Sequence, residues 1–338
     1  MTALSASPMV PMTFPMTSTS TTSQCLLNSS TMSLRLCSSK PVTAGADMKP
    51  LSALNSSSVN LNQLTASRME LKLTELTVKS VARRPFTMEP RHVLVREPGD
   101  SYAGCLSTHP LHHTVSLRKA REQHAVYCGT LEELGLEVIR VPRDDAHPDS
   151  CFVEDNAVVE NGKALICRMA KPSRRGEQPG VAAALEGLMP VRWAEEPATI
   201  EGGDVVHVDG KLICGITDRT NPEGVAQMQE WLGVPVSTVF DPSIMHLKSY
   251  VTYLGRGVMI ATEKYCRHPA LEGFHILVPP AEDEYAADTL AVGDTVLMAE
   301  GYDTAQQMVK EVGFEVVSLD VSEIQKCDGA LTCLSILF

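Results

Sequence analysis

A unit made of two apolar strands, a glycine-containing turn and a helix recurs along residues 92–338 and constrains the fold more than any other feature. Four hairpins are recognisable, at residues 156–167, 204–214, 250–261 and 290–299. The first two turn at Asn-Gly and Asp-Gly dipeptides, the strongest short-range signal for a β-hairpin. The turns lie 48, 47 and 36 residues apart, at Gly162, Gly210, Gly257 and Gly293.

Helix-like segments stand beside these hairpins, at residues 117–126, 181–189, 223–232 and 304–312. Gly135, Gly233 and Gly313 follow three of them, where a helix C-cap is expected. A period of about 40 to 50 residues with atypical end copies favours a radial or stacked repeat. With strands at residues 92–96 and 331–338, we predict about five units in one α/β domain spanning residues 86–338. An ordinary mixed α+β sheet is the alternative, because hairpins are common.

Residues 1–85 differ in composition from the rest of the chain. They are rich in Ser, Thr, Met and Pro, and they hold eight Lys and Arg against three Asp and Glu. Without apolar periodicity such a segment cannot form a core, so we expect a disordered extension, with Met88 as an alternative start. An organellar transit peptide is the competing interpretation, because transit peptides are Ser-rich and poor in acid.

The remaining residues hold 21 Lys and Arg against 38 Asp and Glu, a net charge of −17 that outweighs the +5 of residues 1–85 and gives the chain its −12. An acidic protein repels nucleic acid and anionic membrane surfaces and favours cationic small molecules. No apolar run reaches the roughly 20 residues that a membrane-spanning helix needs. We therefore expect neither a nucleic-acid nor a membrane partner.

Ten cysteines are scattered along the chain without a C-x-x-C pair. A chain of this length does not need disulfides for stability, so the pattern predicts reduced cysteines, a cytoplasmic location and no structural zinc. A transit peptide in residues 1–85 would make the location organellar instead. Cys167 and Cys214 lie in apolar runs, where cysteine usually acts as a small buried hydrophobic residue.

Polar clusters stand just ahead of the hairpins, where a radial arrangement would bring them together. Asp149, Glu154 and Asp155 precede the first hairpin, and Glu201-Gly-Gly-Asp204 precedes the second. Buried carboxylates need a cation or a proton, so these clusters indicate a bound cation, whether metal or substrate. A solvated turn is the plainer explanation for each cluster alone.

His246 enters the third hairpin, and Cys333 stands in the closing segment. Alone, a histidine is more often structural than catalytic, and Cys333 is one cysteine among ten. Their order after the carboxylates strengthens the case, because a thiol nucleophile needs a base and that base needs a carboxylate to orient it. The pattern predicts a cysteine hydrolase.

Six motifs recur in the order found in a known family, and the match as a whole runs from about residue 92 to residue 338. They are Phe152-Val-Glu-Asp155, Ser173-Arg174-Arg175, Glu201-Gly-Gly-Asp204, Arg219-Thr-Asn221, His246-Leu-Lys-Ser249 and Asp328-Gly-Ala-Leu-Thr-Cys333. Together they resemble the dimethylarginine dimethylaminohydrolases of the pentein superfamily. The resemblance implies a five-bladed β/α propeller of ββαβ-type units around a central active site, in agreement with the repeat.

The resemblance also implies a role for each site residue. It makes Cys333 the nucleophile, His246 the general acid and base, and Glu201 the residue that orients the histidine. Glu154 and Asp155 would bind the guanidinium of the substrate, and Arg174 and Arg219 would bind its carboxylate. The α-amino group would be bound by Leu106, Asp149 and the backbone of Cys327. The family often has a valine-like residue where Cys327 stands.

The implied reaction hydrolyses dimethylarginine or monomethylarginine to citrulline and dimethylamine or methylamine through a covalent thiouronium, which would relieve inhibition of nitric oxide synthase. It needs no cofactor. Zinc on Cys333, His246 and Asp328 would inhibit, because a metal-bound thiolate cannot act as a nucleophile. The expected partner is a small-molecule methylated arginine, bound by a monomer or a homodimer.

Two alternatives remain open. Arginine and agmatine deiminases of the same superfamily typically carry an aspartate two places after the catalytic histidine, to bind the second guanidinium nitrogen. Here that position is Lys248, which favours an N-methylated substrate. A non-catalytic pentein that binds zinc or another ligand is the second alternative.

Overall fold

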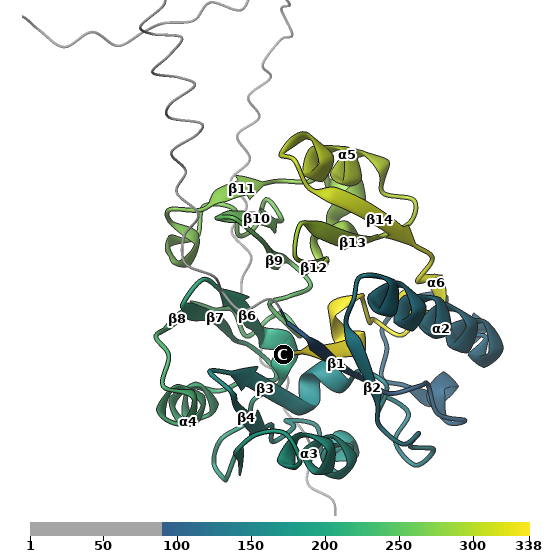
Figure 1. Cartoon of the computed structure of the whole chain (residues 1–338), viewed down its shortest axis with the longest axis vertical. Helices are drawn as coiled ribbons and strands as arrows, with labels where there is room; N and C mark the ends of the chain where they lie inside the picture. The colour runs from purple at the N-terminus through teal and green to yellow at the C-terminus, as the bar shows by residue number, and fades with distance from the viewer. Residues whose placement is uncertain (1–89) are drawn as a thin grey trace, which may run out of the picture. The chain divides into compact units, whose positions relative to one another are not determined.

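Five three-stranded sheets, arranged in a ring, form the part of the chain that the computed structural model describes, residues 90–338 (Figure 1). The predicted extension at residues 1–85 lies outside these residues. One sheet contains β1 (His92–Val95), β2 (Glu137–Arg140) and β15 (Ser335–Leu337). The next two contain β3 (Ala157–Glu160), β4 (Lys163–Ile166) and β5 (Val191–Trp193), and then β6 (Val205–Val208), β7 (Lys211–Ile216) and β8 (Val236–Phe240). The last two contain β9 (Val251–Gly255), β10 (Val258–Ala261) and β11 (His275–Leu277), and then β12 (Leu290–Val292), β13 (Thr295–Ala299) and β14 (Glu315–Leu319).

All five sheets share one connection pattern. The middle strand of each sheet pairs antiparallel with one neighbour and parallel with the other, and the parallel neighbour always follows it in the chain. A parallel neighbour requires a crossover connection, which is helical in four units: α2 (Leu117–Glu133), α3 (Gln178–Glu186), α4 (Pro222–Leu232) and α5 (Asp303–Glu311). Only a 3-10 turn, Pro269–Leu271, serves this role before β11. The five predicted ββαβ units are confirmed, and β15 completes the first sheet by pairing antiparallel with β1.

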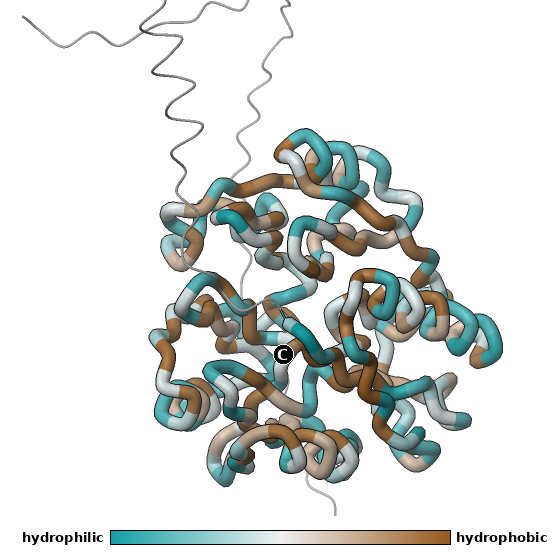
Figure 2. Tube along the Cα trace, in the orientation of Figure 1, coloured by the Kyte–Doolittle hydropathy of each residue, from teal (hydrophilic) through white to brown (hydrophobic). Residues whose placement is uncertain are grey.

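Burial falls from the middle strand of each sheet toward its third strand. The middle strands β4, β7 and β13 are almost continuously buried, whereas β2 and β5 have no fully buried residue. Figure 2 shows the hydrophobic residues concentrated in the strands and the hydrophilic ones in the connections. Among residues 90–338, the apolar side chains form five clusters. Each hairpin therefore lies toward the middle of the ring, and the third strand lies toward its outside.

Helix α4 illustrates how local sequence sets the length of a crossover. The Asn221 side chain accepts a hydrogen bond from the Gly224 amide at 2.8 Å, and Pro222 occupies the first helical position, where its missing N–H costs nothing. Gly233 ends the helix with φ +71°, a left-handed conformation that glycine adopts without strain. The predicted helix and its glycine C-cap are both confirmed.

The end of the chain differs from its prediction. Residues 331–338 were expected to form one strand, but Thr332–Leu334 form a 3-10 turn and only Ser335–Leu337 pair as β15. Similar 3-10 turns precede β3 (Val153–Asn156) and β6 (Gly202–Asp204). Alternation of apolar residues cannot reveal these turns, because each spans only three or four residues.

The helices of residues 90–338 are all too short or too polar to cross a membrane. Cys167 and Cys214 are buried, as predicted for small apolar side chains.

Candidate active site

The 3-10 turns that lead into the hairpins bring the predicted polar clusters to one cavity near the middle of the ring. Cys333 and His246 both line it. The other lining residues are Leu106, Asp149, Phe152, Asp155, Arg174, Arg219, Met245, Cys327, Asp328 and Gly329. Every predicted site residue except Glu154 and Glu201 therefore faces the cavity.

Glu201 lies fully buried behind His246 and binds it. The histidine Nε2 is 2.9 Å from Glu201 Oε2 and 3.6 Å from Asp155 Oδ1. Burial alone would lower the pKa of His246, but the carboxylates of Asp155, Glu201 and Asp204 outweigh it and raise that pKa to about 9. The imidazole is consequently protonated at neutral pH.

Cys333 occupies the 3-10 turn before β15 and is 9% exposed. Burial, reinforced by the carboxylates of Asp288, Glu154 and Asp155, raises the pKa of the Cys333 thiol far above its ordinary value. In the empty cavity the pair is therefore a neutral thiol and a charged imidazolium. A cation placed beside the sulfur would favour the thiolate, because it offsets the surrounding negative charge.

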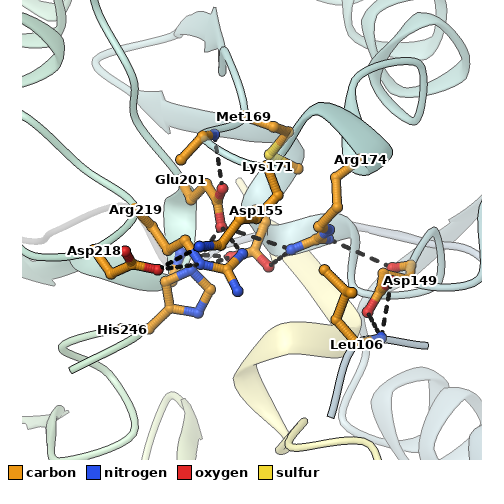
Figure 3. A network of polar contacts seen from close by, with 12 residues as sticks. Leu106, Asp149, Asp155, Met169, Lys171, Arg174, Glu201, Asp218, Arg219 and His246 are labelled. Carbon is orange, nitrogen blue, oxygen red and sulfur yellow. Dashed lines mark hydrogen bonds and ion pairs between the residues drawn. The ribbon is translucent and has the colours of Figure 1, made fainter. Parts of the chain in front are cut away.

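Asp155 and Arg174 form the second half of this buried group (Figure 3). Arg174 Nη1 donates to Asp155 Oδ2 at 2.8 Å, while its Nε and Nη2 donate to Glu177 at 2.9 and 2.8 Å. Asp155 Oδ1 also accepts from the Gly203 amide at 3.0 Å. Although burial opposes its charge, His246 and Arg174 hold the pKa of Asp155 below its usual range. We call Asp155, Arg174, Glu201 and His246 the acid–histidine cluster.

Gly203 shows how closely the two turns approach each other. A Cβ added to this glycine would lie 2.8 Å from both Asp155 Oδ1 and the His246 ring. Real Cβ atoms essentially never come so near, so the tandem glycines of the second cluster permit the approach, as their sequence suggested.

Glu154 occupies a position other than the predicted one. Its two carboxylate oxygens accept from Lys248 Nζ at 2.6 Å and from Thr332 Oγ1 at 2.9 Å, and it does not line the cavity. Neighbouring residues of a 3-10 turn point in different directions, so Asp155 faces the cavity and Glu154 lies behind it, next to the turn that carries Cys333. Lys248 neutralises this buried carboxylate, a partnership that its sequence position did not reveal.

Arg219 faces the cavity beside the cluster. Its Nη1 donates to Glu201 Oε2 at 3.3 Å, and its Nε lies 3.4 Å from Asp218. All three guanidinium nitrogens of Arg174 already donate to carboxylates. Of the two arginines predicted to bind the substrate carboxylate, only Arg219 makes contacts long enough to be replaced easily by bonds to a ligand. The sequence analysis did not identify Glu177 as the partner of Arg174. Its position three residues after an arginine is nevertheless a signal for an ion pair.

Leu106 and Asp149 meet at the opposite end of the cavity. The Leu106 amide donates to both Asp149 carboxylate oxygens, at 3.1 and 3.3 Å (Figure 3). The third predicted member, Cys327, lines the same cavity. The three residues predicted to hold an α-amino group are thus brought together.

Cys327 forms a disulfide with Cys105, so the expectation that every cysteine is reduced is wrong for this pair. The two cysteines are 222 residues apart in sequence, and only the folded chain brings them together. The six other cysteines within residues 90–338 are free.

Two clusters among residues 90–338 have the spacing of metal ligands. They are Asp155, Glu201 and His246, and Cys105, His112 and Cys327. The predicted inhibitory zinc site at Cys333, His246 and Asp328 is not one of these clusters, although all three residues line the cavity. That site remains a prediction.

Comparison with known proteins gives consistent results. The family model for eukaryotic N,N dimethylarginine dimethylhydrolase matches residues 105–266. An N(G),N(G)-dimethylarginine dimethylaminohydrolase of Streptomyces coelicolor is 36% identical over 253 residues, covering 74% of this chain and 97% of that protein. The protein of the same name from Pseudomonas aeruginosa is 32% identical over 253 residues, covering 73% and 99%.

Solved structures agree in fold. The Pseudomonas aeruginosa protein, as a cysteine-to-serine mutant complexed with citrulline, superposes with a TM-score of 0.72 at 31% identity, covering 74% of this chain and all of that one. The N-terminal domain of the cyanobacterial arginine dihydrolase ArgZ gives a TM-score of 0.67 at 22% identity, covering 73% and 96%. At that identity the second likeness concerns the fold alone.

Proposed function

The chain belongs to the dimethylarginine dimethylaminohydrolase family, a group of hydrolases that act on C–N bonds, and from that premise we propose that it hydrolyses methylated L-arginine to L-citrulline. The expected co-product is dimethylamine from the dimethyl substrate and methylamine from the monomethyl one. The buried pairing of Glu201 with His246, in one cavity with Cys333, is the observation that carries the proposal.

Cys333 is proposed as the nucleophile. A guanidinium bound in the cavity brings the positive charge that favours thiolate, and the sulfur then adds to the guanidinium carbon. His246, protonated at rest, donates its proton to the departing amine and leaves a covalent thiouronium. The neutral imidazole next takes a proton from water, and the hydroxide adds to the same carbon. The C–S bond then breaks to return the thiolate, and the added hydroxyl loses its proton to solvent as citrulline is released.

Charged and polar groups around the cavity match the charged groups of such a substrate. Asp155 offers a buried carboxylate to the guanidinium, and Arg219 offers a guanidinium to the substrate carboxylate, a geometry that favours bidentate pairing. Asp149, together with the backbone at Leu106 and Cys327, suits the α-ammonium group. We assign Glu154 a supporting role, because Lys248 and Thr332 occupy both of its oxygens.

Substrate choice is tested by comparing kcat/KM for asymmetric dimethylarginine, monomethylarginine and plain arginine, with citrulline as the common product. We expect the methylated substrates to be preferred. Faster turnover of arginine would overturn the substrate assignment and favour a deiminase.

The nucleophile is tested with Cys333→Ser, which should retain the fold and lose turnover. Cys214→Ser, at another buried free cysteine, controls for the loss of a thiol. Residual activity above a few per cent in Cys333→Ser would contradict the assignment.

Two further properties belong to this proposal. The chemistry needs no cofactor, and zinc held by His246 with Cys333 or with the nearby carboxylates would inhibit by occupying the acid–base group. By consuming methylated arginine, the enzyme would relieve inhibition of nitric oxide synthase. We propose that it works in the cytoplasm as a monomer or homodimer.

A further inference from the structure

The disulfide partners Cys105 and Cys327 lie at the edge of the substrate cavity, on two separate segments. Cys105 begins the loop formed by residues 105–111, which we call the rim loop. Cys327 belongs to the segment that follows helix α6 (Ser322–Gln325) and leads to Cys333. A covalent bond here joins two walls of one cavity.

The rim loop borders both the cavity and a hollow outside it. A second, outer hollow shares Leu106, Arg219, Met245 and Asp328 with the cavity. Leu106, Ser107 and Thr108 line one side of that hollow, and residues 171–173 and Asp218 contribute to the other. A ligand that enters the cavity therefore passes the rim loop.

Hydrogen bonds reinforce the covalent link at the same place. Ser107 Oγ donates to the Lys326 carbonyl at 2.9 Å, and the Thr108 amide and hydroxyl donate to Asp328 Oδ2 at 2.6 and 3.0 Å. Beyond these bonds the loop is exposed, with Leu106 at 40% and Leu111 at 51%. Few contacts other than the disulfide hold the loop across the entrance.

His112 lies beside one sulfur of the pair. Its Nε2 is 3.3 Å from Cys105 Sγ. A histidine at this distance can hydrogen-bond the sulfur that takes part in thiol–disulfide exchange. The disulfide thus has beside it a group suited to exchange, which a purely structural crosslink does not need.

We propose that Cys105 and Cys327 are a reversible thiol–disulfide site that exchanges with low-molecular-weight disulfides and ties the rim loop across the substrate cavity when oxidised. In the forward direction Cys105 thiolate attacks oxidised glutathione, forming a mixed disulfide and releasing one glutathione thiolate. Cys327 thiolate then attacks Cys105 Sγ, forming the internal disulfide and releasing the second. The two cysteine protons end on the two glutathiones, and two reduced glutathiones reverse both steps.

Oxidation affects ligand exchange, a consequence that rests on the proposed function. A tied loop slows product release, and lid opening limits turnover in many enzymes. We expect oxidation to lower kcat and KM together, roughly 3- to 10-fold, because citrulline leaves more slowly. Activity changes alone would not establish the site, so the decisive readouts are independent of activity.

The first experiment titrates the native full chain with mixtures of reduced and oxidised glutathione, blocks free thiols with N-ethylmaleimide and quantifies crosslinked peptides by mass spectrometry. The Cys105–Cys327 peptide should appear and disappear reversibly with the ratio. Two free thiols in oxidised glutathione alone would overturn the proposal, as would a pair that stays linked in excess dithiothreitol.

The second experiment measures hydrogen exchange of the Leu106 and Thr108 amides in both redox states. Exchange should be roughly tenfold faster after reduction, since local opening exposes both amides. Equal protection in the two states would show that the disulfide does not tie the loop. Failure of the proposed function would leave both physical readouts intact.

Variants and a metal assay complete the test. Cys105→Ser should abolish the redox response of these amides and of kcat, and Cys266→Ser, at a half-buried free cysteine, should leave the response unchanged. His112→Gln should slow exchange with glutathione. The metal assay measures zinc bound to the reduced chain. The proposal would be overturned if one zinc bound per chain, if Cys105→Ser abolished this binding, and if bound zinc prevented oxidation. These results would indicate a metal site at Cys105, His112 and Cys327.

Discussion

The acid–histidine cluster and the rim loop face the same cavity but are held in opposite ways. In the cluster every member is buried and has two or more charged or amide partners within 3.7 Å. The rim loop lies at the surface and depends on one disulfide, a few hydrogen bonds and the contact of Leu106 with Asp149. The reacting end of the site is thus preorganised, whereas the end that admits the substrate can move.

The difference follows from what each region does. Groups that stabilise a transition state must not reorganise during the reaction, so their partners are fixed by the fold. A loop at an entrance must open for every turnover, and regions that open belong to the least stable part of a structure. Changes in the cluster should therefore affect kcat and stability strongly, and changes in the rim loop should affect KM weakly.

The largest effect is expected from Glu201→Gln. Loss of the carboxylate removes the hydrogen bond that orients His246 and one of its buried counter-charges, so kcat should fall roughly 1,000- to 10,000-fold, as when a catalytic triad loses its acid. Steady-state kinetics measure this. Glu160→Gln removes a similar carboxylate–histidine pair, to His207 at 3.0 Å, away from the cavity, and should change kcat less than twofold. If Glu201→Gln lowered kcat only slightly, the acid–histidine cluster would not have the proposed catalytic role.

Lys248→Met should have the next largest effect, on stability. It leaves the buried Glu154 without its cation, and breaking a buried pair in this way costs about 3 to 5 kcal/mol of unfolding free energy. Urea denaturation measures the change. Combining Lys248→Met with Glu154→Gln should recover most of the loss, because no uncompensated charge then remains. Equal stability of the single and double variants would contradict the pairing.

The pKa of His246 predicts a third, smaller effect. Its folded pKa of about 9 exceeds the unfolded value of about 6.5, so its contribution to stability is complete below pH 6.5 and is lost as pH rises toward 9. The loss is on the order of 3 kcal/mol. Burial also raises the pKa of Asp288 to about 7 and that of the Cys333 thiol above its ordinary value, so the contribution of the histidine is obtained by difference. The unfolding free energy of His246→Gln should fall less steeply from pH 7 to 9 than that of the unmodified protein, and an unchanged slope would assign it to other groups.

Thr108→Val should have the smallest effect. It removes the hydroxyl bond to Asp328 and leaves the backbone bond, so the rim loop loosens only slightly. We expect kcat and KM to rise together by about two- to fivefold, the worth of one hydrogen bond, because a looser loop releases the product faster. Thr130→Val, which removes an exposed helix-surface hydroxyl, should change neither constant. A large fall in kcat would mean that the loop also positions reacting groups.

Much of the fold could be read from local sequence, because its signals are local. Asn-Gly and Asp-Gly turns specify hairpins over a few residues, and Gly233 marks the end of a helix. The 3-10 turn at Thr332–Leu334 was missed because three residues carry no periodicity. The lack of a helix before β11 was not foreseen either, since the sequence between β10 and β11 gave no clear signal.

The site was only partly predictable. The order of carboxylate, histidine and cysteine along the repeats favoured a cysteine hydrolase, and the family resemblance assigned the roles of Glu201, His246 and Cys333. Which of the adjacent residues Glu154 and Asp155 faces the cavity depends on the orientation of a 3-10 turn, and composition does not encode it. The partners Glu177 of Arg174 and Lys248 of Glu154 became evident only when the distances were known.

By itself, the sequence determined the repeating unit, the family and the residue types that can perform the chemistry, because hairpin turns, helix caps and motif order act over short stretches of chain. The tertiary structure decided which carboxylate faces the substrate, the protonation of His246 and the pairing of Cys105 with Cys327. These properties depend on burial and on distances between residues far apart in sequence, and such distances exist only after the five units close into a ring.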